Sequence, residues 1–242
     1  MPSVEILDRS DMQDKLMKQL VLRPRETAMV TIDMHRGHLD STVATMPAGE
    51  EDARRVIANS KEALDLARDY GVPVIHVILV WRKIPNLGSE GMTVPFWRAV
   101  TAIKEDENRL TPGRKSTIND HNLVGSVGTQ IIPELYKDGD YVIDNKKRLD
   151  CFMGTDLDML LKNLNVTSVC MMGINTNTCV LNTTFTAFNL NYRAVVMSDC
   201  VASMYGDDLH IFGIQNVARC LGWICDNEEF KQKLDEGRRI ND

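Results

Sequence analysis

The chain has 242 residues, of which 43% are hydrophobic and 26% are charged. This length and composition suit one folded domain with a sizeable core and exclude collagen-like and disordered chains. The 28 basic and 34 acidic residues give a net charge of −6, which lacks the basic footprint of a nucleic-acid-binding protein. No apolar run approaches the roughly 20 residues that span a bilayer, and the N-terminus has no signal-peptide core. We therefore expect a cytoplasmic protein that binds neither nucleic acid nor membranes.

The expected elements follow one another as alternating strands and helices. Residues 1–24 are predicted to be an N-terminal extension, and residues 25–242 a single domain. Residues 81–133 are rich in Pro and Gly, which predicts a long excursion over the surface with a helix near residues 96–104. Strands are predicted at 27–33, 72–80, 141–143, 168–173, 193–198 and 222–225, and helices at 50–70, 156–163, 178–190, 207–221 and 228–236.

This alternation predicts a three-layer α/β fold of the Rossmann-like kind, an open parallel sheet with helices on both faces. Ligands of such sheets bind beyond the carboxyl ends of the strands. The chain has no G-x-S-x-G elbow, no P-loop and no G-x-G-x-x-G sequence. The sequence therefore lacks the main motifs of serine hydrolases, nucleoside triphosphatases and dinucleotide-binding proteins.

The six cysteines include one at a chemically distinctive place. With no secretory signal and no C-x-x-C pair, neither a disulfide framework nor a structural zinc site is expected. Cys179 follows the strand that ends at Gly173 and is predicted to open a helix. The positive end of a helix dipole lowers a thiol pKa and favours the thiolate nucleophile, while nearby N–H groups can hold an oxyanion. The alternative is a small packing residue beneath the sheet.

Two further candidates end neighbouring strands. Asp33 follows the apolar run of the first strand, where partial desolvation raises a carboxyl pKa towards general-base work; its alternative is a turn or cap residue. A basic triplet, Lys146 to Arg148, follows the strand at 141–143. One cation of the three beside a thiolate and a carboxylate would stabilise both, and the other two are expected on the surface.

The motifs D33-x-H, K146-x-R148-x-x-x-F152-x-G154-T155 and G173-I-x-T-x-x-C179-V resemble those of the isochorismatase-like cysteine hydrolases. The resemblance runs from about residue 27 to residue 223. It implies an Asp33, Lys146 and Cys179 catalytic triad, a cis peptide at Ile174–Asn175 and an oxyanion hole made by the Asn175 and Cys179 N–H groups. It implies a homo-oligomer, a dimer or tetramer, and an enzyme without a cofactor.

The resemblance also implies a reaction class. We expect a cysteine-dependent amidohydrolase that cleaves a small linear amide, carbamoyl or ureido C–N bond through a thioester. The alternatives are a vinyl-ether hydrolase, which does not need the cysteine, and a non-catalytic interaction module on the same scaffold. Nicotinamidases of this family carry a D-x-H metal motif after the second strand, and residues 80–83 lack it. Nicotinamidase activity is therefore disfavoured.

Further residues are predicted to surround the pocket. The candidate substrate-binding residues are His35, Trp81, Arg82, Trp97 and Asn177. An arginine of the excursion (Arg82, Arg98, Arg109 or Arg114) would bind a carboxylate bidentately, so we expect a substrate with a carboxylate or second carbonyl near the scissile amide. His35 and His38 also suit Zn²⁺ or Mn²⁺, but hydrogen-bonding roles are favoured for them, and no metal is expected.

Overall fold

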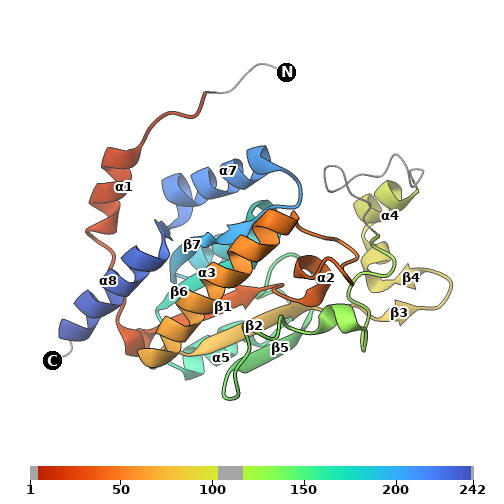
Figure 1. The fold of residues 1–242 in the computed structure, drawn as a ribbon, viewed down its shortest axis with the longest axis horizontal. Helices are drawn as coiled ribbons and strands as arrows, with labels where there is room; N and C mark the ends of the chain where they lie inside the picture. Colours follow the sequence, from red (N-terminus) through yellow and green to blue (C-terminus); the bar gives the residue numbers. More distant parts are fainter. Residues whose placement is uncertain (1–4, 103–116, 241–242) are drawn as a thin grey trace.

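The computed structural model describes residues 5–102 and 117–240. A six-stranded parallel sheet runs through the molecule in the order β5-β2-β1-β6-β7-β8 (Figure 1). The strand order reverses at β1, which pairs with β2 on one side and with β6 on the other. The bounds are β1 Thr27–Ile32, β2 Val74–Leu79, β5 Tyr141–Lys146, β6 Ser168–Ile174, β7 Arg193–Ala202 and β8 Trp223–Cys225.

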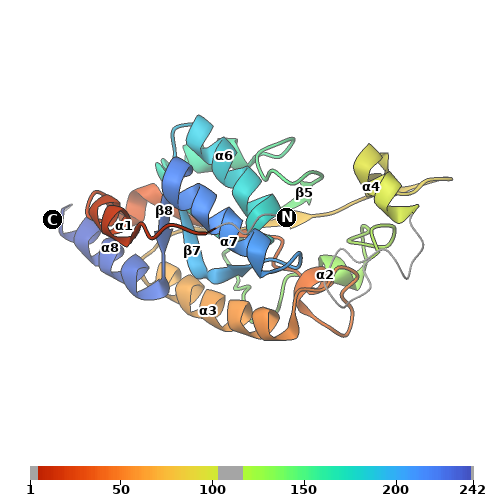
Figure 2. The ribbon, with the colours of Figure 1, turned by 90° about the horizontal axis from the view of Figure 1, so that it is seen from above.

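Helices cover both faces of this sheet and make three layers (Figure 2). Helices α3 (Glu50–Asp69) and α8 (Asn227–Arg239) lie on one face, and α5 (Leu157–Asn163), α6 (Leu181–Asn189) and α7 (Asp207–Asn216) lie on the other. Strand β1 supplies side chains to both layers, because successive residues of a strand point to opposite faces. Met29 packs in the first apolar core, and Ala28, Val30 and Ile32 pack in the second.

The excursion after β2 contains short elements rather than a bare loop. These are β3 (Lys83–Ile84), β4 (Gly88–Ser89), a 3₁₀ turn (Glu90–Thr93), α4 (Pro95–Thr101) and a second 3₁₀ turn (Val127–Thr129). The predicted helix at 96–104 is confirmed through Thr101, and its last two positions lie outside the described residues. A 3₁₀ turn (Pro24–Glu26) precedes strand β1, and helix α2 (Arg36–Leu39) follows it.

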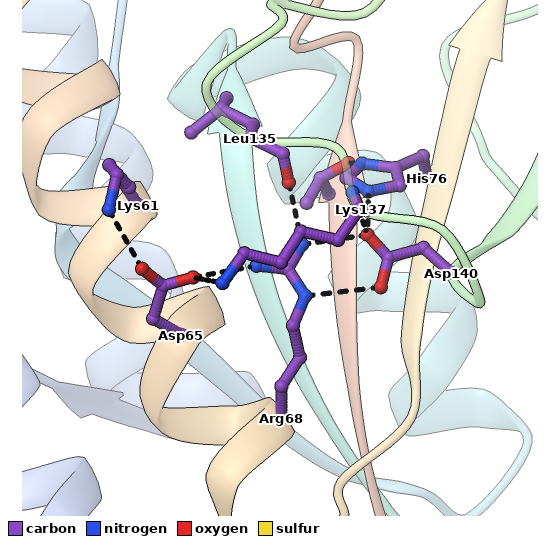
Figure 3. Close-up of polar contacts among 8 residues, drawn as sticks. Lys61, Asp65, Arg68, His76, Leu135, Lys137 and Asp140 are labelled. Atoms are coloured by element: carbon purple, nitrogen blue, oxygen red, sulfur yellow. Dashed lines mark hydrogen bonds and ion pairs between the residues drawn. The ribbon is translucent and has the colours of Figure 1, made fainter.

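An ion-pair cluster joins α3 to the loop before β5, at the end of the sheet opposite the strands' carboxyl ends (Figure 3). Arg68 holds Asp140 with two bonds, 2.7 Å from Nη2 to Oδ2 and 3.2 Å from Nε to Oδ1. The same carboxylate lies 3.1 Å from Nε2 of the buried His76, on β2. Asp65, one turn before Arg68, bonds the Nζ atoms of Lys61 and Lys137 at 2.8 and 2.7 Å.

Several boundary predictions need correction. The strand predicted at 193–198 extends to Ala202, and the helix predicted at 207–221 is α-helical to Asn216 and continues as a π-helical turn (Val217–Leu221). The strand predicted at 141–143 extends to Lys146, because it pairs with β2 as far as Leu79. The helix predicted at 178–190 is divided into a π-helical turn (Thr176–Val180) and α6, so Cys179 does not open an α-helix. The predicted extension is part helical (α1, Ser10–Met17), but Leu20 and Leu22 are buried in the first core, so the domain begins before residue 25.

Candidate active site

The side chains of Asp33, Lys146 and Cys179 meet at the carboxyl end of the sheet. Lys146 Nζ lies 2.5 Å from Asp33 Oδ2 and 3.4 Å from Cys179 Sγ. Asp33 and Lys146 are fully buried and Cys179 is 4% exposed. The selection of Lys146 over Lys147 follows from strand alternation: Lys146 is buried, whereas the next lysine bonds the Val80 carbonyl at the surface. The three predicted catalytic residues therefore form one cluster.

The position of Asp33 depends on an unusual backbone conformation. Its φ is +55°, in the left-handed region that few residues other than glycine adopt. The turn places Asp33 Oδ1 2.8 Å from the Leu79 N–H, which donates to it from the end of β2. On the other side, a Cβ at Gly173 would lie 2.0 Å from the Ile32 carbonyl oxygen. Only glycine allows β6 to pass so close to the residue before Asp33.

The turn that carries Cys179 is fixed from two directions. The Ile174–Asn175 peptide is cis, as the resemblance implied. The Asn175 carbonyl accepts the N–H groups of Thr178 and Val180, each at 3.1 Å, and Asn175 Oδ1 accepts the Met204 N–H at 2.8 Å. The turn is thus tied both to itself and to the residues after β7. In the sequence, Cys179 stands between Thr178 and Val180, whose N–H groups both donate to the Asn175 carbonyl.

Burial decides the protonation of the thiol. It raises the pKa of Cys179 to about 12, because the positive charge of Lys146 is already offset by Asp33 and a hydrogen bond to Asp33 favours the protonated thiol. The expectation that the turn lowers this pKa is therefore wrong. Lys146 keeps its charge: burial opposes it, but the charge of Asp33 raises its pKa above the usual value. In the resting cluster Lys146 is therefore an ammonium and Cys179 a neutral thiol.

Three predicted pocket residues lie in segments next to this cluster. Trp81 and Trp97 belong to the excursion, and Asn177 belongs to the turn that carries Cys179. Trp81 is buried, and its Nε1 donates to the Lys147 carbonyl at 3.2 Å. The Trp97 ring packs 5.1 Å from that of Trp81, centroid to centroid. Asn177 accepts the Ser203 hydroxyl at 2.7 Å, so its side chain is held towards the end of β7. These contacts connect the excursion to the residue after Lys146, and the end of β7 to the turn that carries Cys179.

The structure does not show an arginine free to bind a substrate carboxylate among the predicted arginines that it describes. The Arg82 side chain is 67% exposed, and Glu90 pairs with its guanidinium. The Arg98 Nε donates to the Met92 carbonyl at 3.1 Å. Arg109 and Arg114 lie outside the described residues. The two described arginines already have partners, so neither supports carboxylate recognition.

Three buried histidines gather beside the triad. His35 and His38 follow β1, and His121 comes from the excursion; adjacent ring centroids are 4.7 to 5.7 Å apart. Burial holds the pKa of each below its usual value, and the pKa values of His35 and His121 lie well below it. The three imidazoles are therefore neutral near pH 7.

Hydrogen bonds set two of the three tautomers. His38 Nδ1 lies 2.7 Å from the Met46 carbonyl, which only accepts, so Nδ1 carries the proton and Nε2 a lone pair. Asn122 Nδ2, which only donates, bonds both the Leu79 carbonyl at 2.7 Å and His35 Nε2 at 2.6 Å. His35 Nε2 therefore accepts, and its proton is on Nδ1. The Thr45 hydroxyl, 2.9 Å from His121 Nδ1, suits either tautomer.

This donor set fits a metal ion poorly. One ligand atom from each histidine lies within 4.8 Å of the others, which makes them the candidate metal-binding group of the described residues. Metal bonds of about 2.1 Å in tetrahedral geometry would place the nitrogens roughly 3.4 Å apart. The free nitrogen of His35 is protonated and cannot be a ligand in this arrangement. The structure thus does not assign a metal to these residues.

Sequence reasoning missed several residues of the site. It assigned no role to His121, and it did not identify Asn122, the Leu79 N–H or Met204. Asn122 follows His121 directly in a long loop, and no local pattern indicates that its amide reaches β2. Asn122 also has a positive φ of +47°, which the surrounding sequence does not indicate.

Comparisons with known proteins show the family of the chain. The isochorismatase domain model matches residues 27–229, so the chain belongs to the isochorismatase family. Its relatives include the ureidoacrylate amidohydrolase RutB of Agrobacterium fabrum, 27% identical over 92% of this chain and 96% of the relative. Another is the same enzyme of Serratia proteamaculans, 28% identical over 89% of this chain and 85% of the relative.

Solved structures share the fold. A cysteine hydrolase from Pseudomonas syringae pv. phaseolicola superposes with a TM-score of 0.72 and 18% identity, over 90% of this chain and 96% of that one. N-carbamoylsarcosine amidase from Thermoplasma acidophilum does so with a TM-score of 0.61 and 23% identity, over 84% of this chain and 97% of that one.

Among the described residues, none of the helices has the length and apolar character needed to cross a membrane.

Proposed function

We propose that the protein is a cysteine-dependent amidohydrolase that cleaves the C–N bond of a small ureido or carbamoyl compound. The observation that carries this proposal is the contact of one buried lysine with both a carboxylate and a thiol, at 2.5 and 3.4 Å. A nucleophile beside a base that a third group orients is the arrangement of covalent acyl transfer. The ureidoacrylate amidohydrolases among the relatives support the ureido class.

The first half-reaction uses Asp33 as the base. Asp33 accepts the Cys179 proton as sulfur attacks the carbonyl carbon, which avoids a standing thiolate in a buried site. The N–H groups of Asn175 and Cys179 bind the oxyanion, and preorganised donors of this kind stabilise the developing charge. Asp33 then returns the proton to the leaving nitrogen as the C–N bond breaks, leaving an acyl or carbamoyl thioester on Cys179.

The second half-reaction restores the enzyme. Water attacks the thioester and gives up a proton to Asp33, the C–S bond breaks, and the proton passes to the Cys179 sulfur. Lys146 holds Asp33 in place and offsets its charge through both halves. These residues supply nucleophile, base and oxyanion donors, so the proposed reaction needs no cofactor or metal.

A panel of compounds tests the reaction class. Ammonia or amine release from ureido and carbamoyl compounds, lost in Cys179→Ala, is the expected result. Hydrolysis of a vinyl ether that persists in Cys179→Ala would instead favour the isochorismatase-type reaction. Turnover of neither class by a protein that is folded by circular dichroism would favour a non-catalytic module and contradict the proposal.

We also infer self-association, which the resemblance implied. Aromatic side chains on neighbouring helices α6 and α7 are unusually exposed, with Phe185 at 44%, Phe188 at 49% and Phe212 at 50%. Large exposed apolar patches are typical of protein interfaces. Sedimentation of the wild type and of Phe188→Glu tests this: the wild type is expected as a dimer or larger, and a monomeric wild type would contradict it.

A further inference from the structure

The nitrogens and oxygens around the histidine cluster include several without a partner. His35 Nδ1, His121 Nε2 and Asn122 Oδ1 are buried, and none has a hydrogen bond. Buried polar atoms without partners are costly, so native proteins keep them where a water or a ligand completes the bonding. Gly37 packs directly against two of them: a Cβ there would lie 2.3 Å from Asn122 Oδ1 and 3.1 Å from His35 Nδ1, so a larger residue could not occupy this position without displacing them.

These atoms are connected to the triad through the backbone of one residue, Leu79. The Leu79 N–H donates to Asp33 Oδ1, and the Leu79 carbonyl accepts from the Asn122 amide that also holds His35. His35 itself lies two residues after Asp33. The edge of His121 packs against Trp81 in the roof, with ring centroids 5.8 Å apart. The cluster therefore forms the wall of the site on the side of Asp33.

The spacing of the imidazole nitrogens suits a hydrogen-bonded guest. A polar group about 2.9 Å from two nitrogens at a tetrahedral angle places them roughly 4.7 Å apart. The ligand atoms of the three histidines lie within 4.8 Å of one another. The spread of the three rings therefore matches hydrogen bonds to one small polar group better than it matches metal bonds.

We propose that the histidine cluster binds the end of the substrate remote from the scissile bond, and that this end is a neutral carboxamide or carbamoyl group. This inference rests on the proposed amidohydrolase function. The wall offers one firm donor, His35 Nδ1–H, and two firm acceptors, His38 Nε2 and Asn122 Oδ1. A primary amide matches it, since its carbonyl accepts once and its NH₂ donates twice.

A carboxylate is the wrong guest for the same wall. It has no proton to donate, so it would face the lone pairs of His38 and Asn122 with His35 Nδ1–H as its one firm donor. The three neutral imidazoles supply no positive charge, and the charge of Lys146 is already paired with Asp33. The sequence led us to expect either a carboxylate or a second carbonyl near the scissile amide. The histidine cluster favours the second of these, as the carbonyl of an amide.

The experiment compares 3-ureidoacrylate with 3-ureidoacrylamide at pH 8, a pair that differs only at the remote end. The wild type is expected to favour the amide by at least tenfold in kcat/KM. In His38→Gln, whose amide can turn an N–H towards the guest, we expect the preference to fall below threefold. The control His76→Gln replaces a buried histidine at the far end of the sheet and should keep the wild-type preference.

Each contrary result has a separate meaning. A wild-type preference for the acid overturns the inference but leaves the proposed reaction intact. A tenfold amide preference that His38→Gln leaves unchanged overturns the role of the cluster. Stoichiometric zinc in the purified wild type, lost in His38→Gln, overturns the neutral donor–acceptor wall. If neither compound is hydrolysed, the proposed function itself fails and this inference with it. The wild-type comparison stands alone if the His38 variant does not fold.

Discussion

Lys146 and Asp33 form a fully buried ion pair, with Lys146 Nζ 2.5 Å from Asp33 Oδ2. A buried pair is costly to desolvate, and removing one partner leaves an uncompensated charge inside the protein. The structure places this pair against the Cys179 thiol at the carboxyl end of the sheet, where it matters for reactivity. The pair is therefore best understood as part of the chemistry, and its loss should affect activity and stability together.

The two neighbouring lysines provide a matched test of that role. Lys146→Ala should lower kcat by at least about a hundredfold and destabilise the fold by roughly 3 kcal/mol, because Asp33 loses its counter-charge. Lys147→Ala, which removes a contact with the Val80 carbonyl and a charge near Glu90, should lower kcat by less than about fivefold. Steady-state kinetics and urea unfolding measure both quantities. Equal losses in the two variants would contradict the assignment.

We expect activity to survive exhaustive chelation. The proposed nucleophile, base and oxyanion donors are all supplied by the chain, and the free nitrogen of His35 is protonated. Turnover should be unchanged, within about twofold, after dialysis against EDTA. A loss that Zn²⁺ or Mn²⁺ restores would mean that the three histidines rearrange to coordinate an ion, and would refute the mechanism without a metal.

The ion-pair cluster before β5 should stabilise the fold without entering the chemistry. Asp140→Asn leaves Arg68 and His76 without their carboxylate, so the free energy of unfolding should fall by about 2–3 kcal/mol. Asp138→Asn, at an exposed position of the same loop, should change it by less than about 0.5 kcal/mol. Urea unfolding of both variants decides this. A similar effect in the two would remove the energetic role from the cluster.

The same cluster predicts part of the acid response. Bonds from Arg68, the Lys137 N–H and His76 lower the pKa of Asp140 against the effect of burial, and Lys137 and Lys61 lower that of Asp65 to about 2. Depressed carboxyl pKa values contribute stability that is present above about pH 4 and lost as the pH falls towards 2. Wild-type stability should therefore drop across that range more steeply than that of Asp140→Asn. Parallel curves would contradict this source of acid sensitivity.

Much of the fold could be predicted because its signals are local. Continuous apolar strands such as residues 72–80 indicate a parallel sheet, and the helix at 50–70 ends where Gly71 adopts a φ of +72°. The π-helical turn at Cys179 has no such signal, because it forms only where the segment packs against β7 and α7. Leu20 and Leu22 were misjudged for a similar reason: their burial depends on contact with α8, far along the chain.

The candidate site divides in the same way. Asp33, Cys179 and the basic triplet could be identified as candidates because each ends a strand or follows one, and parallel strands bring their carboxyl ends together. The choice of Lys146 and the grouping of the three as a triad rested on the family resemblance. The histidine wall could not, since it depends on Asn122 reaching back to the Leu79 carbonyl from a loop with no regular pattern. The thiol pKa was misjudged because a dipole argument neglects burial beside an ion pair that is already neutral.

The central claim is that Cys179 carries the substrate acyl or carbamoyl group during turnover. Acid quench of the enzyme mixed with a ureido substrate, followed by peptide mass spectrometry, measures this directly. We expect the adduct mass on the peptide that contains Cys179 in the wild type, and neither adduct nor measurable turnover in a folded Cys179→Ser variant, since serine lacks thiolate reactivity. Turnover by Cys179→Ser at more than about a hundredth of the wild-type rate, or an adduct on another cysteine, would contradict the account.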